Sequence, residues 1–164
     1  MCRVIQPWCY PGGRYDPGLD VLGGCKVSQF RLEVPSDPAC MKIVRSSVES
    51  LCSMAGLSEN ESCKVVLAID EACTNIIRHS YDGVYDKPII CQGKLENHKL
   101  LFVLQDYGKK VDPSKVRSRE LADVRPGGLG VHFIQEVMDR MEFEDCGEEG
   151  TRLFLEKKIP ESGA

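Results

Sequence analysis

The sequence predicts an α+β two-layer sandwich, in which helices pack on one face of a mixed but mostly antiparallel sheet. Three observations predict it. Segments of alternating hydrophobicity are typical of half-buried strands, segments of helical periodicity lie between them, and consecutive strands are separated by short turns. The length of 164 residues suits one domain. We expect residues 1–26, which are rich in proline and glycine, to form an irregular extension and residues 27–160 to form the domain.

The first half of the domain predicts one strand and two helices. Val27–Val34 alternates between polar and apolar residues and is expected to be an edge strand. Ser36–Pro38 supplies a cap and an N-terminal proline for a helix that Gly56 ends. A capping-box pattern at Ser58 begins the second helix, whose apolar face continues to about Ser80.

The second half predicts two hairpins and one helix. The expected hairpins pair Ile89–Leu95 with Lys99–Asp106, and Met141–Asp145 with Thr151–Ile159. Between them, Lys109–Pro126 has no regular pattern. The glycines of Gly127–Gly130 then open a helix that is expected to continue to about Met141.

Composition excludes several function classes. Lys and Arg number 21 against 25 Asp and Glu, so we expect no direct binding of nucleic acid. The longest apolar stretches are far shorter than the roughly 20 residues of a membrane span, and the N-terminus lacks the pattern of a secretory signal. The nine cysteines contain no C-x-x-C pair, which indicates reduced thiols in a cytoplasmic protein. A metal site at Cys2, Cys9 and Cys25 remains an alternative.

A polar stripe on the second helix is the first candidate for chemistry. Glu71, Asn75 and His79 recur at every fourth position and therefore lie on one side of the helix. A carboxylate and a carboxamide one turn apart can serve as general base and Mg²⁺ ligand, and Arg78 with His79 can meet phosphate oxygens. The alternative is an ordinary solvent-facing stripe.

The second candidate is Asp106, which ends an apolar strand and is followed closely by Gly108. A carboxylate at such a strand end can accept a hydrogen bond from an exocyclic amine such as that of adenine, and glycine leaves room for a flat ring. By itself, the Asp-x-Gly pattern is also that of a simple turn.

The third candidate is the glycine-rich start of the last helix, within Arg125–Ile134. Free backbone N–H groups at a helix N-terminus can bind phosphate, although a glycine-rich hinge has the same composition. The preceding segment, Lys109–Pro126, holds six Lys or Arg against three acids. A basic cover over a triphosphate has this character.

In order and spacing, these motifs together with Gly150-Thr151 resemble the GHKL ATPases, and most closely the anti-sigma factor serine kinases. The resemblance spans about Val27 to Ile159 and implies the Bergerat ATP-binding fold, with ATP and Mg²⁺ as cofactors. It further implies phosphorylation of Ser or Thr on a STAS-type antagonist, and a homodimer that holds a sigma factor. By matching position, Glu71 is the general base and Asn75 the Mg²⁺ ligand. The resemblance further implies phosphate contacts from Arg78 and from the backbone of Gly128 and Gly130. It implies that Asp106 holds the adenine amine, with Gly108 beneath the ring and Thr151 supporting the carboxylate. His79 and Leu129 complete the predicted ATP-binding residues.

One departure from the family pattern keeps other functions open. Lys110 stands where the fuller box has a second glycine, which favours a non-catalytic module that uses ATP only to set its binding surface. The cysteine excess suggests a thiol-based sensor, which requires a thiol of low pKa. A sensor histidine kinase is not expected, because the region before Val27 is short and rich in proline and glycine.

Overall fold

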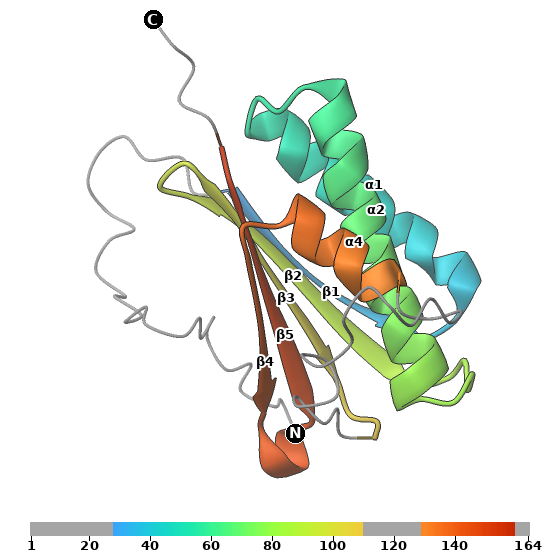
Figure 1. The fold of residues 1–164 in the computed structure, drawn as a ribbon. Helices are drawn as coiled ribbons and strands as arrows, with labels where there is room; N and C mark the ends of the chain where they lie inside the picture. The colour runs from blue at the N-terminus through green and yellow to red at the C-terminus, as the bar shows by residue number, and fades with distance from the viewer. Residues whose placement is uncertain (1–27, 110–128, 160–164) are drawn as a thin grey trace, which may run out of the picture.

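A computed structural model describes residues 28–109 and 129–159. Its five strands form one sheet in the order β1-β2-β3-β5-β4, and all four strand pairs are antiparallel. The α-helices cover one face of that sheet (Figure 1). The predicted two-layer α+β class is therefore confirmed, and the described strands contain no parallel pair. The strands are β1 (Ser28–Pro35), β2 (Pro88–Glu96), β3 (Lys99–Asp106), β4 (Arg140–Asp145) and β5 (Thr151–Lys158).

The first two helices begin where the sequence predicts. The Asp37 side chain accepts a 2.8 Å hydrogen bond from the Ala39 N–H at the start of η1 (Pro38–Cys40), a 3₁₀ turn that leads into α1 (Met41–Met54). At Ser58 the capping box is present in both directions and begins α2 (Glu59–Asn75). Local side-chain bonds to the first free N–H groups thus fix both helix starts.

The ends of two helices differ from what their hydrophobic periodicity predicts. The second helix does reach Ser80, but its last five residues form a π-helical turn, η2 (Ile76–Ser80). The last helix, α4 (Leu129–Val137), ends four residues before the predicted Met141. That prediction was wrong because the Asp139 N–H donates to the Glu156 carbonyl at 2.8 Å, which draws the chain into β4.

The main core lies between the helices and the sheet. In β1, Phe30, Leu32 and Val34 face the helices, as the alternation predicts. The largest fully buried side chains come from α1, α2, α4 and the inner strands, among them Leu51, Ile69, Phe102, Leu104 and Leu155. The strand ends and helix ends at one edge of this core position the candidate site.

Candidate functional site

Asp106, at the end of β3, is the buried centre of the predicted site. Only 4% of its surface is exposed, and it pairs in register with Thr151, the first residue of β5, which is also buried. The Asp106 Oδ1 atom accepts a 2.9 Å hydrogen bond from the Gly108 N–H. The structure therefore brings together three residues that the sequence predicted for one ligand contact.

The end of the second helix holds this strand end in place. The Ser80 carbonyl accepts a 2.9 Å bond from the Lys109 N–H, and the Ser80 side chain is hydrogen-bonded to Asp106. The Tyr81 hydroxyl accepts from the Tyr107 N–H at 2.9 Å and donates to the Pro88 carbonyl at 2.6 Å. Ser80 and Tyr81 were missed by sequence analysis, because a single polar residue at a helix end carries no distinctive pattern.

Burial dominates the electrostatics of this cluster. It raises the pKa of Asp106 above its ordinary value, while the Gly108 N–H and the Ser80 side chain oppose that shift by bonding to the ionised form. Burial also raises the pKa of Tyr81 to about 12. The Tyr81 phenol therefore stays protonated near neutral pH and keeps its bond to the Pro88 carbonyl.

Glu71 on α2 faces the beginning of α4. A Cβ atom built on Gly130 would overlap the Glu71 Oε1 atom, so only a glycine lets the backbone approach this carboxylate so closely. Glu71 itself is half-buried. The predicted base and the predicted phosphate-binding helix start are thus neighbours in the fold, although they lie 59 positions apart along the chain.

The other predicted contacts lie around this pair. Asn75 is half-buried one turn after Glu71, whereas Arg78 and His79 are exposed on η2, outside the buried Asp106 cluster. Leu129 is the first residue of α4. Gly128, Lys110 and the basic segment up to Pro126 lie outside the described residues.

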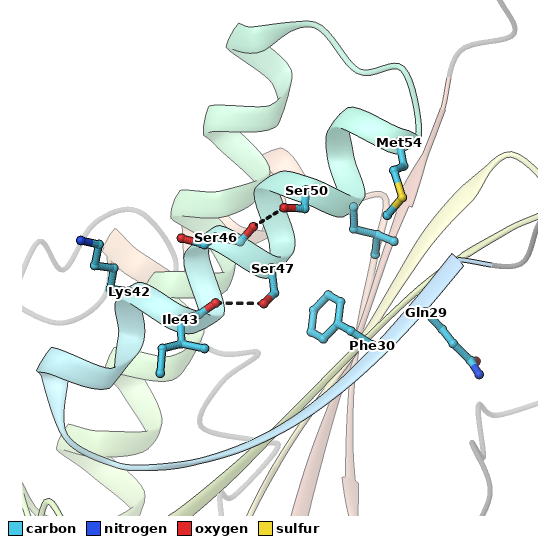
Figure 2. A pocket seen from close by; sticks show the side chains of 9 residues that line it. Gln29, Phe30, Lys42, Ile43, Ser46, Ser47, Ser50 and Met54 are labelled. Carbon is cyan, nitrogen blue, oxygen red and sulfur yellow. Dashed lines mark hydrogen bonds between the residues drawn. The ribbon is translucent and has the colours of Figure 1, made fainter.

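A separate groove of about 560 Å³ opens between α1 and β1. Figure 2 shows Phe30 of β1 below Ser47 and Met54 of α1, with Ile43 to one side of it. None of the predicted site residues that the structure describes lines it. The groove is therefore a feature distinct from the Asp106 and Glu71 neighbourhood.

The described residues also bear on the metal, membrane and thiol alternatives. In the ranges 28–109 and 129–159, no group of three or more potential metal ligands occurs, and no helix is long and apolar enough to cross a bilayer. Cys2, Cys9 and Cys25 lie outside these ranges. Burial raises the pKa of Cys52 and Cys73 to about 12 and that of Cys91 well above its ordinary value. These three thiols lack the low pKa that a thiol sensor needs.

Comparison with known proteins bears on the same region. Residues 34–157 match the family described as the histidine kinase-like ATPase domain. The chain belongs to this family. The resemblance to the GHKL ATPases drawn from the motifs is therefore confirmed, and the matched range spans the described residues of the predicted site, from Glu71 to Thr151.

Among curated relatives of this ATPase-family chain are several named serine-protein kinase RsbW. The one from Halalkalibacterium halodurans is 26% identical over 127 residues, which is 72% of this chain and 77% of the relative. The one from Listeria innocua is 27% identical over 142 residues, covering 81% and 88%. The one from Bacillus anthracis is 24% identical over 142 residues, covering 82% and 87%.

Proposed function

We propose that this chain is an ATP-binding regulator of the anti-sigma type. It phosphorylates a Ser or Thr hydroxyl on a STAS-type antagonist protein and, as a cytoplasmic homodimer, sequesters a sigma factor. Membership of the ATPase family and similarity to proteins named serine-protein kinases support the phosphoryl-transfer part. The sigma factor, the antagonist and the dimer rest on the motif resemblance alone.

The observation that carries the proposal is the contact between Glu71 and the start of α4. A kinase needs a base beside the transferred phosphoryl group, and a helix N-terminus is a natural site for phosphate. The Glu71 carboxylate lies against the Gly130 backbone. The base and the phosphate-binding group therefore come from two different helices that meet at one place.

The described donors fit a purine nucleotide with Mg²⁺. Asp106 offers a buried carboxylate at a strand end, which suits an exocyclic amine, and Asn75 offers a carboxamide oxygen of the kind that Mg²⁺ binds. When bound, ATP supplies the phosphoryl group and Mg²⁺ neutralises charge on its phosphates. Besides the expected contact with adenine, the fold itself requires glycine at position 108, since a Cβ there would overlap the Ser80 carbonyl.

In the proposed reaction the chain contributes positioning and one proton acceptor. Asp106, supported by Thr151, orients the nucleotide. Glu71 accepts the proton of the substrate hydroxyl. At the same time the hydroxyl oxygen forms a bond to the γ-phosphorus of ATP, and the bond between that phosphorus and the oxygen that leaves with ADP breaks. Arg78 and His79, exposed beside Asn75, supply positive charge or hydrogen bonds toward the phosphates.

Binding is tested by calorimetric titration of the full chain with ATP and Mg²⁺. We expect saturable binding that falls at least about tenfold in Asp106→Asn, because one lost charged hydrogen bond is worth about 1.5–3 kcal/mol. Asp86→Asn, which changes an exposed acid, is the matched control and should bind like the unaltered protein. Equal affinity in all three proteins would remove Asp106 from the nucleotide site.

Transfer is tested with γ-labelled ATP and a purified STAS-type antagonist. Glu71→Gln should lose at least about a hundredfold in rate, the usual contribution of general base catalysis, with ATP binding retained. Glu59→Gln on the same helix is the control. Gly130→Ala should reproduce the loss, because its methyl group would displace the Glu71 carboxylate. Full transfer by Glu71→Gln would refute the base assignment.

Lys110 favours a second function, that of an ATP-binding interaction module without turnover. It replaces the second glycine of the box that shapes the nucleotide loop in the fuller family pattern. The same experiment separates the two functions. Saturable ATP binding together with no label on an antagonist that binds the chain would establish the module and reject the kinase.

A further inference from the structure

The helix-free face of the sheet has an apolar centre that is almost fully buried. Ile90 is 4% exposed, Leu101 7%, Val103 5% and Phe154 1%. Each lies between residues of the main core along its strand and therefore points away from the helices. Strand register makes them one patch. Val103 pairs with Phe154, Leu101 lies two residues from Val103, and Ile90 pairs with Gln105, which lies two residues from Val103 on the other side.

The edges of this face are exposed, unlike its centre. Gln29, Arg31 and Glu33 of β1 and Glu144 of β4 are all exposed to solvent. Side chains on a sheet stand roughly perpendicular to it, so neighbours in the same layer shield their sides and leave their tips open. Exposures of 1–7% therefore require a cover above the patch.

No described helix supplies that cover, since α1, α2 and α4 all lie on the opposite side (Figure 1). A buried acidic side chain also indicates that this face of the sheet is covered. Glu156, on this face beside Leu101 in register, is buried and pairs with Lys99 Nζ at 2.8 Å. An acidic side chain in the middle of an open sheet face would ordinarily remain in water.

We propose that residues 1–27 of this chain are the cover of the helix-free face. They lead directly into β1, which is an edge of the same sheet. Extended, they can reach up to about 90 Å, whereas five strands span only about 20 Å. Their first ten residues include the large apolar or aromatic side chains of Met1, Val4, Ile5, Trp8 and Tyr10.

The remaining two segments outside the described ranges fit less well. Residues 110–128 follow Lys109, which is bonded to Ser80, and precede Gly130, which lies against Glu71, so both ends are anchored on the helix side of the sheet. Residues 160–164 number five and contain no large apolar side chain. Residues 1–27 are therefore better suited to cover the helix-free face than either of these segments, because of where they attach, their length and their composition. Such a cover does not depend on ATP binding or on phosphoryl transfer.

Trp8 gives a direct test, because it is the only tryptophan in the chain. Its emission and its quenching by acrylamide are measured in the folded full-length protein and again in urea. We expect folded-state emission at shorter wavelength and quenching several-fold weaker than in urea, both independent of protein concentration. Solvent-like Trp8 in the folded chain would overturn the proposal, and emission that shifts on dilution would assign the cover to a second copy instead.

Two substitutions locate the contact. Leu101→Gln, on the helix-free face, should shift Trp8 emission toward that of the unfolded chain. Ile43→Gln, in the groove between α1 and β1, should not. The opposite pattern would place the extension in the groove and overturn the proposal.

Circular dichroism shows whether Leu101→Gln still folds. A second pair of variants covers the case that it does not, because their substitutions lie in residues 1–27 and not in the folded domain. Ile5→Lys should shift Trp8 emission and increase the binding of a hydrophobic dye, because the released patch is apolar. Gln6→Lys adds the same charge at the neighbouring polar position and is the matched control. Equal effects of the two substitutions, or none from Ile5→Lys, would overturn the proposal.

Discussion

The glycines near Asp106 and Glu71 and the glycines of the outer turns differ in what surrounds them. In the first group, an added Cβ would overlap atoms of another segment, as at Gly108, Gly130 and Gly150. In the second group, nothing lies within 4 Å of that position, as at Gly56, Gly83 and Gly147. Every member of the second group has a positive φ, whereas Gly150 alone does so in the first.

This difference shows two separate uses of glycine. In the outer turns, glycine supplies a backbone conformation that other residues adopt only at some cost. In the first group, the missing side chain lets the backbone approach another segment closely. The neighbouring group is the Ser80 carbonyl at Gly108, the Glu71 carboxylate at Gly130 and the Asp106 carbonyl at Gly150. Substitutions in the two groups should therefore differ in both size and kind of effect.

The largest effect is expected from Gly150→Ala. The backbone there has φ 87° and ψ −152°, a region nearly confined to glycine, and the new methyl group would overlap the Asp106 carbonyl oxygen. The conformation alone costs about 1–3 kcal/mol, and the overlap adds to it. We expect the free energy of unfolding in urea to fall by about 3 kcal/mol or more.

Gly147→Ala is the matched control for that substitution. It lies three residues earlier in the same connection, has φ 63° and has open space around it. Only the left-handed conformation is penalised, so the loss should be about 1–2 kcal/mol. Equal losses at the two positions would show that the close approach at Asp106 contributes nothing.

The contrast also explains what sequence could predict. The starts of α1 and α2 were predictable because their caps are bonds between near neighbours at Asp37 and Ser58. The grouping of Asp106, Gly108 and Thr151 followed from motif order. The support from Ser80 and Tyr81 was not predictable, since it joins segments 26 residues apart in the case of Tyr81 and Tyr107. The early end of α4 likewise depended on a sheet partner, Glu156.

An intermediate effect is expected from the charge of Asp106. Its pKa is raised in the folded state, so its contribution to stability is fully present below the unfolded pKa and is lost as pH rises through the folded pKa. Asp106→Asn removes this dependence. Relative to the unaltered protein, the variant should therefore gain stability as pH rises from acid to neutral. Urea unfolding across that range measures it, and a parallel pH profile for both proteins would contradict the raised pKa.

The smallest effect is expected at the ion pair that joins α1 to α2. Arg45 Nη1 lies 2.8 Å from Asp70 Oδ1, but the two side chains are 42% and 29% exposed. Water screens such a pair, and holding two side chains together costs entropy, so we expect a coupling of about 0.5 kcal/mol. A double-mutant cycle with Arg45→Met and Asp70→Asn measures it, and added salt should reduce it further. A coupling of about 2 kcal/mol or more is beyond the range of an exposed pair. It would mean that the interface between α1 and α2 excludes water as the Asp106 cluster does. The ion pair and the Asp106 cluster would then not differ in their access to solvent.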